Sequence, residues 1–198
     1  MEESLDRIAS FILAAGMSKR MGSENKLLKK YNNNTILNQT VKNHSESKLK
    51  KINIIIGYDK EEIINALKDF DVIIIENKDF ESGMLSSIKK IKNNIDDKVS
   101  GIMISLGDMP LVSKDDINHI VEKFLSNFEK KICIPVFNKK LGNPIIIPVN
   151  IYKELIKNDK LLNDKGLKNI ILENKYNIIK VNTSSGVLRD FDTEKDFN

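Results

Sequence analysis

A short segment near the start of the sequence combines small residues with cationic side chains, as a site for an anion would. It reads FILAAGMSKRMGSENK, in which an apolar run leads into a polar loop. Small residues let backbone amides approach an anion closely, and an arginine or lysine can neutralise its charge. A loop whose charges simply face water is the alternative. The residues expected to surround a polyphosphate are Ala14, Ala15, Gly16, Ser18, Arg20, Gly22 and Lys26.

The spacing of the glycines in this segment excludes two common phosphate-binding motifs. Gly16 and Gly22 enclose five residues, whereas a P-loop has four, followed at once by Lys-Ser or Lys-Thr. A dinucleotide-binding fingerprint needs three glycines as G-x-G-x-x-G, and the segment has two. Hydride transfer therefore loses its main support, and the segment predicts a phosphate site of another kind.

Asp108 is the first candidate metal ligand, because it follows directly on a second apolar run in MISLGDMPLVSKDD. Ligands of open parallel sheets bind beyond the carboxyl ends of the strands. Asp108 is therefore expected beside the opening loop, with Ser113 capping the helix that follows. The alternative is an aspartate that only caps the Gly-Asp-Met-Pro turn.

A pair of aspartates in VLRDFDTEKDF supplies the second candidate ligand. Asp190 and Asp192 flank a phenylalanine, so both point to one side if the stretch is extended. Mg²⁺ is commonly held by one or two carboxylates together with substrate phosphates, so Asp108 and one of this pair could share the ion. Helix capping by Asp192 or Thr193 is the alternative.

Aliphatic runs alternate with amphipathic segments along most of the sequence. The runs expected as buried parallel strands are 8–15, 52–57, 72–75, 101–106 and 132–136. Apolar residues three and four apart predict helices over 35–44, 60–68, 83–93 and 114–127. Further along, 143–149 and 176–182 are expected as strands, and 150–157 and 164–173 as short helices. This alternation predicts an α/β protein.

Composition limits the class of protein further. A chain of 198 residues without an internal repeat suits one domain. Its 32 basic and 28 acidic residues are interspersed, which does not predict a nucleic-acid partner. We expect no signal peptide and no membrane span, because the aliphatic runs are short. The single cysteine, Cys133, suits the cytoplasm and is expected to be buried, whereas His44 and His119 are expected at the surface and not as zinc ligands.

Together, these stretches resemble the nucleotidyltransferases of molybdenum-cofactor biosynthesis in the MobA-like NTP transferase family. The resemblance is greatest to the branch of cytidylyltransferases and of accessory proteins of molybdenum hydroxylases. It covers nearly the whole sequence. LAAGMSKRMG with Lys26 is similar to the nucleotide-binding signature, and the later blocks occur in the same order: ENKDFESGMLSSI, LGDMPLV, GNPIII, NDKGLKNII and RDFDTEKD.

The resemblance implies a single-domain, Rossmann-like fold with a mostly parallel sheet flanked by helices. Residues of about 8–110 would form the nucleotide-binding part and 111–198 the acceptor side. The implied reaction is Mg²⁺-dependent transfer of CMP from CTP to molybdopterin, with release of pyrophosphate. Ala-Ala-Gly in the opening loop favours CTP, because the guanylyl branch typically has Ala-Gly-Gly. Transfer of GMP or another nucleotide to a small phosphate remains open, as does a non-catalytic protein that hands the cofactor to a molybdenum hydroxylase.

The same resemblance implies a role for each matching residue. Arg20 and Lys26 would contact the triphosphate, Asp108 would hold the metal, and Asp192 would be its second ligand. Many relatives have Asp-Thr-Pro-Glu-Asp at the last motif, whereas this sequence has Asp-Thr-Glu-Lys-Asp. The missing proline leaves Asp190 as the alternative second ligand. The residues implied to border the base and ribose are Asn77, Gly83 and Ser87.

Overall fold

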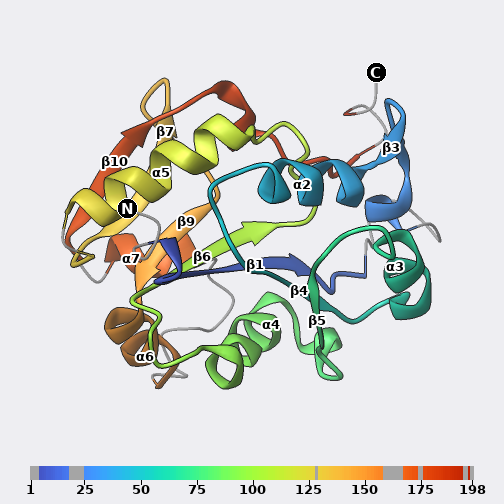
Figure 1. Ribbon diagram of the computed structural model, residues 1–198, viewed down its shortest axis with the longest axis horizontal. Helices are drawn as coiled ribbons and strands as arrows, with labels where there is room; N and C mark the ends of the chain where they lie inside the picture. Colours follow the sequence, from blue (N-terminus) through green and yellow to red (C-terminus); the bar gives the residue numbers. More distant parts are fainter. Residues whose placement is uncertain are drawn as a thin grey trace.

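A mostly parallel β-sheet crosses the protein and has helices on both faces (Figure 1). The computed structural model describes residues 5–17, 25–127, 129–157, 167–173, 176–193 and 196. The strands are β1 Ile8–Ala14, β4 Ile52–Ile56, β5 Ile73–Glu76, β6 Gly101–Leu106, β7 Ile132–Phe137, β8 Lys140–Leu141, β9 Ile145–Pro148 and β10 Ile178–Asn182. The helices are α2 Ile36–Ser45, α3 Lys60–Ala66, α4 Met84–Ile91, α5 Lys114–Ser126, α6 Val149–Lys157 and α7 Leu167–Glu173.

The strand order is β10-β7-β9-β6-β1-β4-β5, with β8 paired to β7. Strands β4 and β6 both run parallel to β1, and Leu13 lies opposite Ile55 on one side and Leu106 on the other. Strand β9 is antiparallel to β6 and β7, between which it lies. The chain thus continues from β1 to β4 and β5 on one side and returns to β6 on the other. Such a reversal of strand order is where α/β sheets bind their ligands.

The alternation of side chains along β1 divides the core into two layers. Phe11 and Leu13 pack with residues of α4, α6 and α7 on one face. Ile12 and Ala14 pack with α2 and α3 on the other face, where α5 covers Cys133. In Figure 1, α2 and α5 lie above the sheet, and α4 and α6 lie below it. Because helices cover both faces, β1, β4, β6 and β7 are buried along almost their whole length, which confirms their prediction as buried strands. The same prediction is wrong for β5 at the edge of the sheet, where Ile73 is 49 % and Ile74 36 % exposed.

Local signals in the sequence set several element boundaries. The hydroxyl of Ser113 accepts a hydrogen bond from the Asp116 amide at 3.1 Å, and the Asp116 carboxylate accepts one from the Ser113 amide. This confirms the predicted cap of α5. Asn32 and Asn33 form the turn between β2 (Lys30–Tyr31) and β3 (Asn34–Thr35), with Asn32 at a φ of +53°. The first part of the helix predicted over 164–173 lies outside the described residues.

The expectation that His44 lies at the surface is wrong. Its exposed fraction is 1 %, because it shares the buried face of α2 with Leu37 and Val41. The ring Nδ1 lies 2.9 Å from the Thr40 carbonyl oxygen, and Nε2 lies 2.8 Å from the Ser105 hydroxyl. A carbonyl only accepts, so Nδ1 carries the hydrogen and Nε2 accepts from Ser105. Burial lowers the pKa of His44 to about 4.

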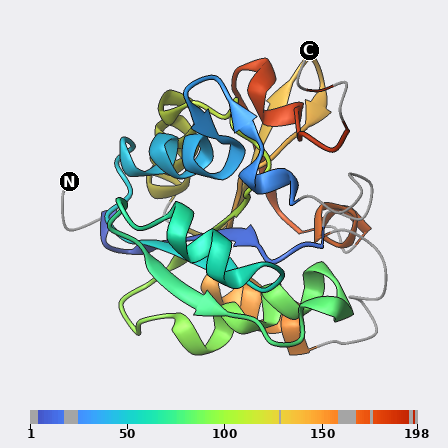
Figure 2. The same ribbon diagram turned by 90° about the vertical axis from the view of Figure 1, so that its right-hand side faces the viewer.

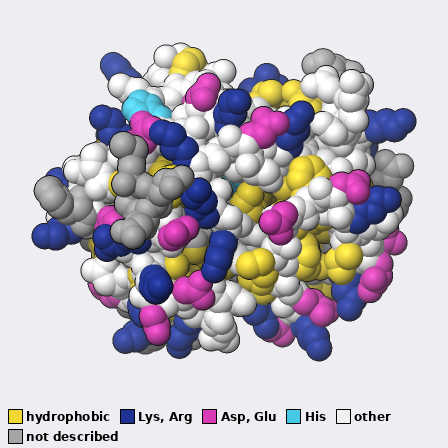
Figure 3. All heavy atoms as spheres, in the orientation of Figure 1, with side chains coloured by type: hydrophobic (Ala, Val, Ile, Leu, Met, Phe, Trp, Pro, Cys, Tyr) yellow, Lys and Arg dark blue, Asp and Glu magenta, His cyan; other side chains and the backbone are white. Residues whose placement is uncertain are grey.

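The surface carries charges of both signs. On the face drawn in Figure 3, Lys and Arg side chains are interspersed with Asp and Glu.

Cys133 is buried, as predicted, and burial raises the pKa of its thiol to about 12. Among the helices in the described ranges, none is both long and apolar enough to cross a bilayer.

Candidate active site

A cleft of about 540 Å³ opens at the carboxyl ends of β1 and β6. Figure 2 views the molecule from the side toward which β1 points in Figure 1. The cleft brings together segments that are far apart in the sequence, as expected where the strand order reverses. Its lining residues are Leu13, Ala14, Ala15, Gly16, Met17, Lys26, Leu27, Phe80, Gly83, Met84, Ser87, Leu106, Asp108, Asp190 and Asp192.

The end of β1 forms one wall of the cleft. Ala14 and Ala15 are buried, and the Tyr58 amide donates to the Ala15 carbonyl oxygen at 3.4 Å. At Gly16 an added Cβ would meet no atom within 4 Å. Packing among the described residues therefore does not demand a glycine there. The space beside it is open toward the cleft, where a ligand can approach the backbone.

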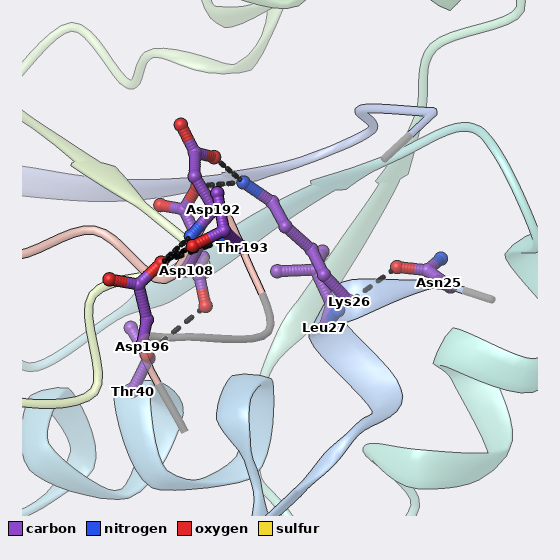
Figure 4. A network of polar contacts seen from close by, with 9 residues as sticks. Asn25, Lys26, Leu27, Thr40, Asp108, Asp192, Thr193 and Asp196 are labelled. Carbon is purple, nitrogen blue, oxygen red and sulfur yellow. Dashed lines mark hydrogen bonds and ion pairs between the residues drawn. The ribbon is translucent and has the colours of Figure 1, made fainter. Parts of the chain in front are cut away.

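Lys26 lies between two carboxylates (Figure 4). Its Nζ is 2.5 Å from Oδ2 of Asp108 and 2.5 Å from Oδ1 of Asp192. Burial lowers the pKa of Lys26, but the two carboxylates outweigh that effect and raise it above its ordinary value. Burial raises the pKa of Asp108, Lys26 opposes that rise, and Asp190 and Asp192 add to it. The three sequence-predicted residues thus form one coupled group of charges.

The turn after β6 holds Asp108 through its backbone. Thr40 of α2 donates its hydroxyl to the Gly107 carbonyl oxygen at 3.1 Å. Asn43 donates its amide to the carbonyl oxygens of Pro110 at 2.9 Å and Val112 at 2.8 Å. Neither Thr40 nor Asn43 was predicted from the sequence, because nothing in the helical pattern of α2 indicates what its polar side chains contact. Helix α2 therefore fixes the turn on both sides of Asp108.

The segment after the 3₁₀ helix Ser185–Leu188 holds Asp192. The Phe191 amide donates to the Asp108 carbonyl oxygen at 2.9 Å, and the Phe191 ring packs edge-on against Tyr31 at 5.2 Å. Asp196 accepts hydrogen bonds from the backbone amides of Asp192 at 3.1 Å and Thr193 at 2.7 Å. The capping carboxylate here is thus that of Asp196, which leaves the Asp192 side chain directed toward Lys26.

Asn77 supports the opposite wall from within the protein. It is fully buried and is not among the residues lining the cleft, unlike Gly83 and Ser87. Its amide nitrogen donates to the hydroxyls of Ser86 at 2.7 Å and Ser87 at 3.1 Å, and its oxygen accepts from the Asp79 amide. Asn77 therefore positions the start of α4 and does not face the ligand space.

Some residues of the site were identified from the sequence, and others were not. Phe80 and Met84 line the cleft and were not singled out, although they lie in the same block as Gly83. Met84 is 52 % exposed. Asp190 lines the cleft together with Asp192, so the predicted alternation holds. The predicted residues Ser18, Arg20 and Gly22 lie outside the described residues.

The carboxylates fit a hard divalent cation. Their oxygens converge on one point, where the Lys26 Nζ lies, and Oδ1 of Asp108 is buried with no hydrogen-bond partner among the described residues. In the described ranges no group of three or more His, Cys, Asp or Glu side chains could hold a metal by itself. Two carboxylates are, however, what Mg²⁺ commonly takes from a protein when substrate phosphates complete its shell. The donor set therefore suits a metal that arrives with a phosphorylated ligand.

A mostly parallel sheet with a cleft at the reversal of strand order, lined by a lysine and aspartates, is the arrangement of an α/β nucleotidyltransferase. The chain belongs to the MobA-like NTP transferase family, whose domain matches residues 10–177. It is a nucleotidyltransferase, which confirms the class predicted from its motifs. The fold and the family resemblance are likewise confirmed.

Two relatives and two solved structures show how similar this chain is to individual proteins. The chain is 25 % identical over 194 residues to the molybdenum cofactor cytidylyltransferase of Escherichia coli, covering 98 % of this chain and 95 % of that protein. It is 28 % identical over 152 residues to the bifunctional protein GlmU of Hydrogenobaculum, covering 76 % of this chain and 32 % of that one. Among solved structures, Rv0371c of Mycobacterium tuberculosis superposes with a TM-score of 0.84 at 21 % identity, covering 98 % of this chain and 96 % of the other. A structure of Rv0371c in complex with manganese superposes with a TM-score of 0.77, covering 96 % of each chain at 21 % identity.

Proposed function

We propose that this protein transfers CMP from CTP to the terminal phosphate of molybdopterin and releases pyrophosphate. The observation that carries the proposal is the convergence of Lys26, Asp108 and Asp192 beside the open end of β1. The end-to-end similarity to a molybdenum cofactor cytidylyltransferase supports the choice of donor and acceptor. The open space at Gly16 supports a ligand that contacts the backbone there.

The proposed reaction needs positioning and charge neutralisation more than it needs a nucleophilic side chain. An oxygen of the acceptor phosphate attacks the α-phosphorus of CTP, and the bond from that phosphorus to the bridging oxygen of pyrophosphate breaks. The acceptor phosphate is ionised at neutral pH, so no general base is required. Lys26, with Arg20 as the sequence predicts, offsets the charge that develops on the leaving pyrophosphate. Gly83 and Ser87 border the base and ribose.

Asp108 and Asp192 are the residues that would hold Mg²⁺. When bound, the ion supplies charge stabilisation at the α-phosphoryl group and at the departing pyrophosphate. Asp108 is suited to this role because its free oxygen is buried within reach of the cleft. Asp190 lines the same cleft and is the alternative partner.

One assay tests the nucleotide donor, the phosphate acceptor and the class of protein together. Purified protein is incubated with Mg²⁺, molybdopterin and CTP, GTP, ATP or UTP in turn, and pyrophosphate release is followed. The proposal expects release with CTP that depends on both molybdopterin and the metal. Preferential release of pyrophosphate with GTP would mean that GTP, and not CTP, is the donor. Tight binding of molybdopterin without release from any triphosphate would instead identify a non-catalytic accessory protein for a molybdenum hydroxylase.

A further inference from the structure

We propose that the outer edge of strand β5 pairs with the same strand of a second copy of this chain, so that two copies form one continuous sheet about a two-fold axis. Strand β5 is the last in the order of the sheet, next to β4. Among the described residues, no strand pairs with its outer edge. An edge of this kind is the part of a sheet that another chain can join. This inference is independent of the proposed function.

The backbone of β5 offers hydrogen-bonding groups to such a partner. The Asn77 amide donates to the Ile56 carbonyl oxygen of β4 at 2.8 Å. Backbone groups alternate between the two edges of a strand, so Ile73 and Ile75 also turn theirs toward β4. The amide and the carbonyl of Ile74 therefore point away from the sheet. An antiparallel strand centred on Ile74 can satisfy both, because two opposed residues there exchange two hydrogen bonds.

The side chains along this edge are apolar and mostly exposed. In β5 only Ile75 is buried, in the core cluster that includes Ile88 of α4. Ile73 and Ile74 project to opposite faces of the sheet, and both are exposed. Figure 3 shows apolar side chains gathered in the region where Figure 1 draws β5. Contiguous apolar surface of this kind marks a contact with another protein.

The charges at the two ends of β5 favour an antiparallel partner of the same sequence. Asp71 precedes the strand and Lys78 follows it, and both side chains are exposed. A two-fold axis at Ile74 places Asp71 of each copy opposite Asn77 of the other, next to Lys78. The attraction between the two charges then occurs twice, as in any isologous contact. A parallel arrangement would instead set Asp71 beside Asp71 and Lys78 beside Lys78.

The other acidic residues at the end of β5 do not compete for Lys78. Glu76 lies 3.2 Å from the ammonium of Lys60, and Asp79 lies 3.4 Å from that of Lys90. Both carboxylates therefore have a lysine within their own chain. Lys78 is left as the cation that an acidic residue of a second copy can approach.

Sedimentation velocity of the whole chain, over a range of concentrations, measures the assembly. We expect the wild type to reach twice the 22.6 kDa of one chain. Ile74→Lys places two like charges at the centre of the pairing and should leave only the single chain. Leu172→Lys is the matched control, because it introduces the same charge at another exposed aliphatic residue, in α7, and should remain a dimer. Ile73→Lys takes the place of Ile74→Lys if thermal melting shows that the latter is unfolded.

An exchange of charges tests whether the two strands are antiparallel. Asp71→Lys alone and Lys78→Asp alone each set like charges side by side twice, and each should weaken dimerisation roughly tenfold. An equimolar mixture of the two variants should recover the dimer, because each charge then meets its opposite in the other copy. The proposal is overturned if the wild type sediments as a single chain, if Ile74→Lys and Leu172→Lys behave alike, or if mixing recovers nothing.

The result is separable from the test of the transfer reaction. None of the substituted residues lines the cleft. A single-chain wild type that releases pyrophosphate overturns the dimer and leaves the proposed function standing. A dimer without pyrophosphate release does the reverse.

Discussion

The side-chain amide of Asn43 donates a hydrogen bond to the carbonyl oxygen of Val112 at 2.8 Å, tying helix α2 to the turn that carries Asp108. The same amide also donates to Pro110 at 2.9 Å, so one side chain spans the turn. Removing it leaves two carbonyl oxygens without their donor and lets the turn shift. Because Asn43 lies outside the cleft lining, its influence on the reaction must pass through Asp108.

Replacing Asn43 by leucine should lower kcat roughly tenfold to a hundredfold, since small displacements of a reacting group can have effects of that size. The KM for CTP, the proposed donor, should change little, because the β1 wall is untouched. Steady-state kinetics, with each substrate in turn at a saturating concentration, measures the effects on kcat and on KM separately. Asn94→Ala is the control, because it removes a comparable 2.9 Å bond from a side chain to the Lys90 carbonyl in an exposed position. Equal losses in both variants would mean a general structural effect.

Asp108→Asn should reduce transfer by roughly a hundredfold or more, which corresponds to ~2.7 kcal/mol of transition-state stabilisation. The amide preserves the shape of the side chain but removes the charge that we propose holds the metal. The melting temperature should change little, because Lys26 keeps Asp192 as a partner. Transfer kinetics and thermal melting provide the test.

Asp192→Asn should have the same effect as Asp108→Asn if it is the second ligand. Asp190→Asn is the comparison, because its side chain lines the same cleft. Transfer rates at saturating Mg²⁺ decide between them. A fully active Asp192→Asn together with an inactive Asp190→Asn would move the second ligand to Asp190.

The two glycines at positions 16 and 186 should respond differently to alanine. A Cβ on Gly186 would lie 2.0 Å from the Leu111 carbonyl oxygen, whereas one on Gly16 meets no atom of the described residues within 4 Å. Gly186→Ala should therefore destabilise the protein by about 1–3 kcal/mol through overpacking. Gly16→Ala should leave stability unchanged and weaken CTP binding. Urea unfolding and calorimetry of CTP binding measure the two effects, and a stability loss confined to Gly16→Ala would contradict this assignment.

His44 should make the protein sensitive to acid. Its pKa is about 4 in the folded protein against an ordinary 6.5, so the unfolded chain binds the proton first. The stability that this group contributes is complete above pH 6.5 and is lost as the pH falls toward 4, by about 3 kcal/mol in total. Urea unfolding at pH 7 and pH 4.5 should show a loss in the wild type that is about 2 kcal/mol larger than in His44→Gln. Equal losses would mean that His44 is not the group responsible.

From the sequence, the edge of the sheet that carries the site could be predicted more completely than the contacts within the site. Asp108 and Gly16 could be located because each follows a buried strand, and parallel strands end at the same edge. The pairing of Lys26 with both aspartates could not be predicted, because it depends on how three distant segments meet. The prediction that His44 lies at the surface was wrong because the sequence does not show its hydrogen-bond partners. Thr40 and Ser105 form hydrogen bonds with the ring and allow it to be buried.

Lys26 and Asp192 are separated by 166 positions along the chain, and Lys26 and Asp108 by 82. A ribosome releases these segments one after another, and domains form as units during synthesis. While the chain is growing, the lysine and the first aspartate can meet long before the second aspartate emerges. A nascent chain thus carries an incomplete charge cluster until β10 and the segment that holds Asp192 have emerged and folded.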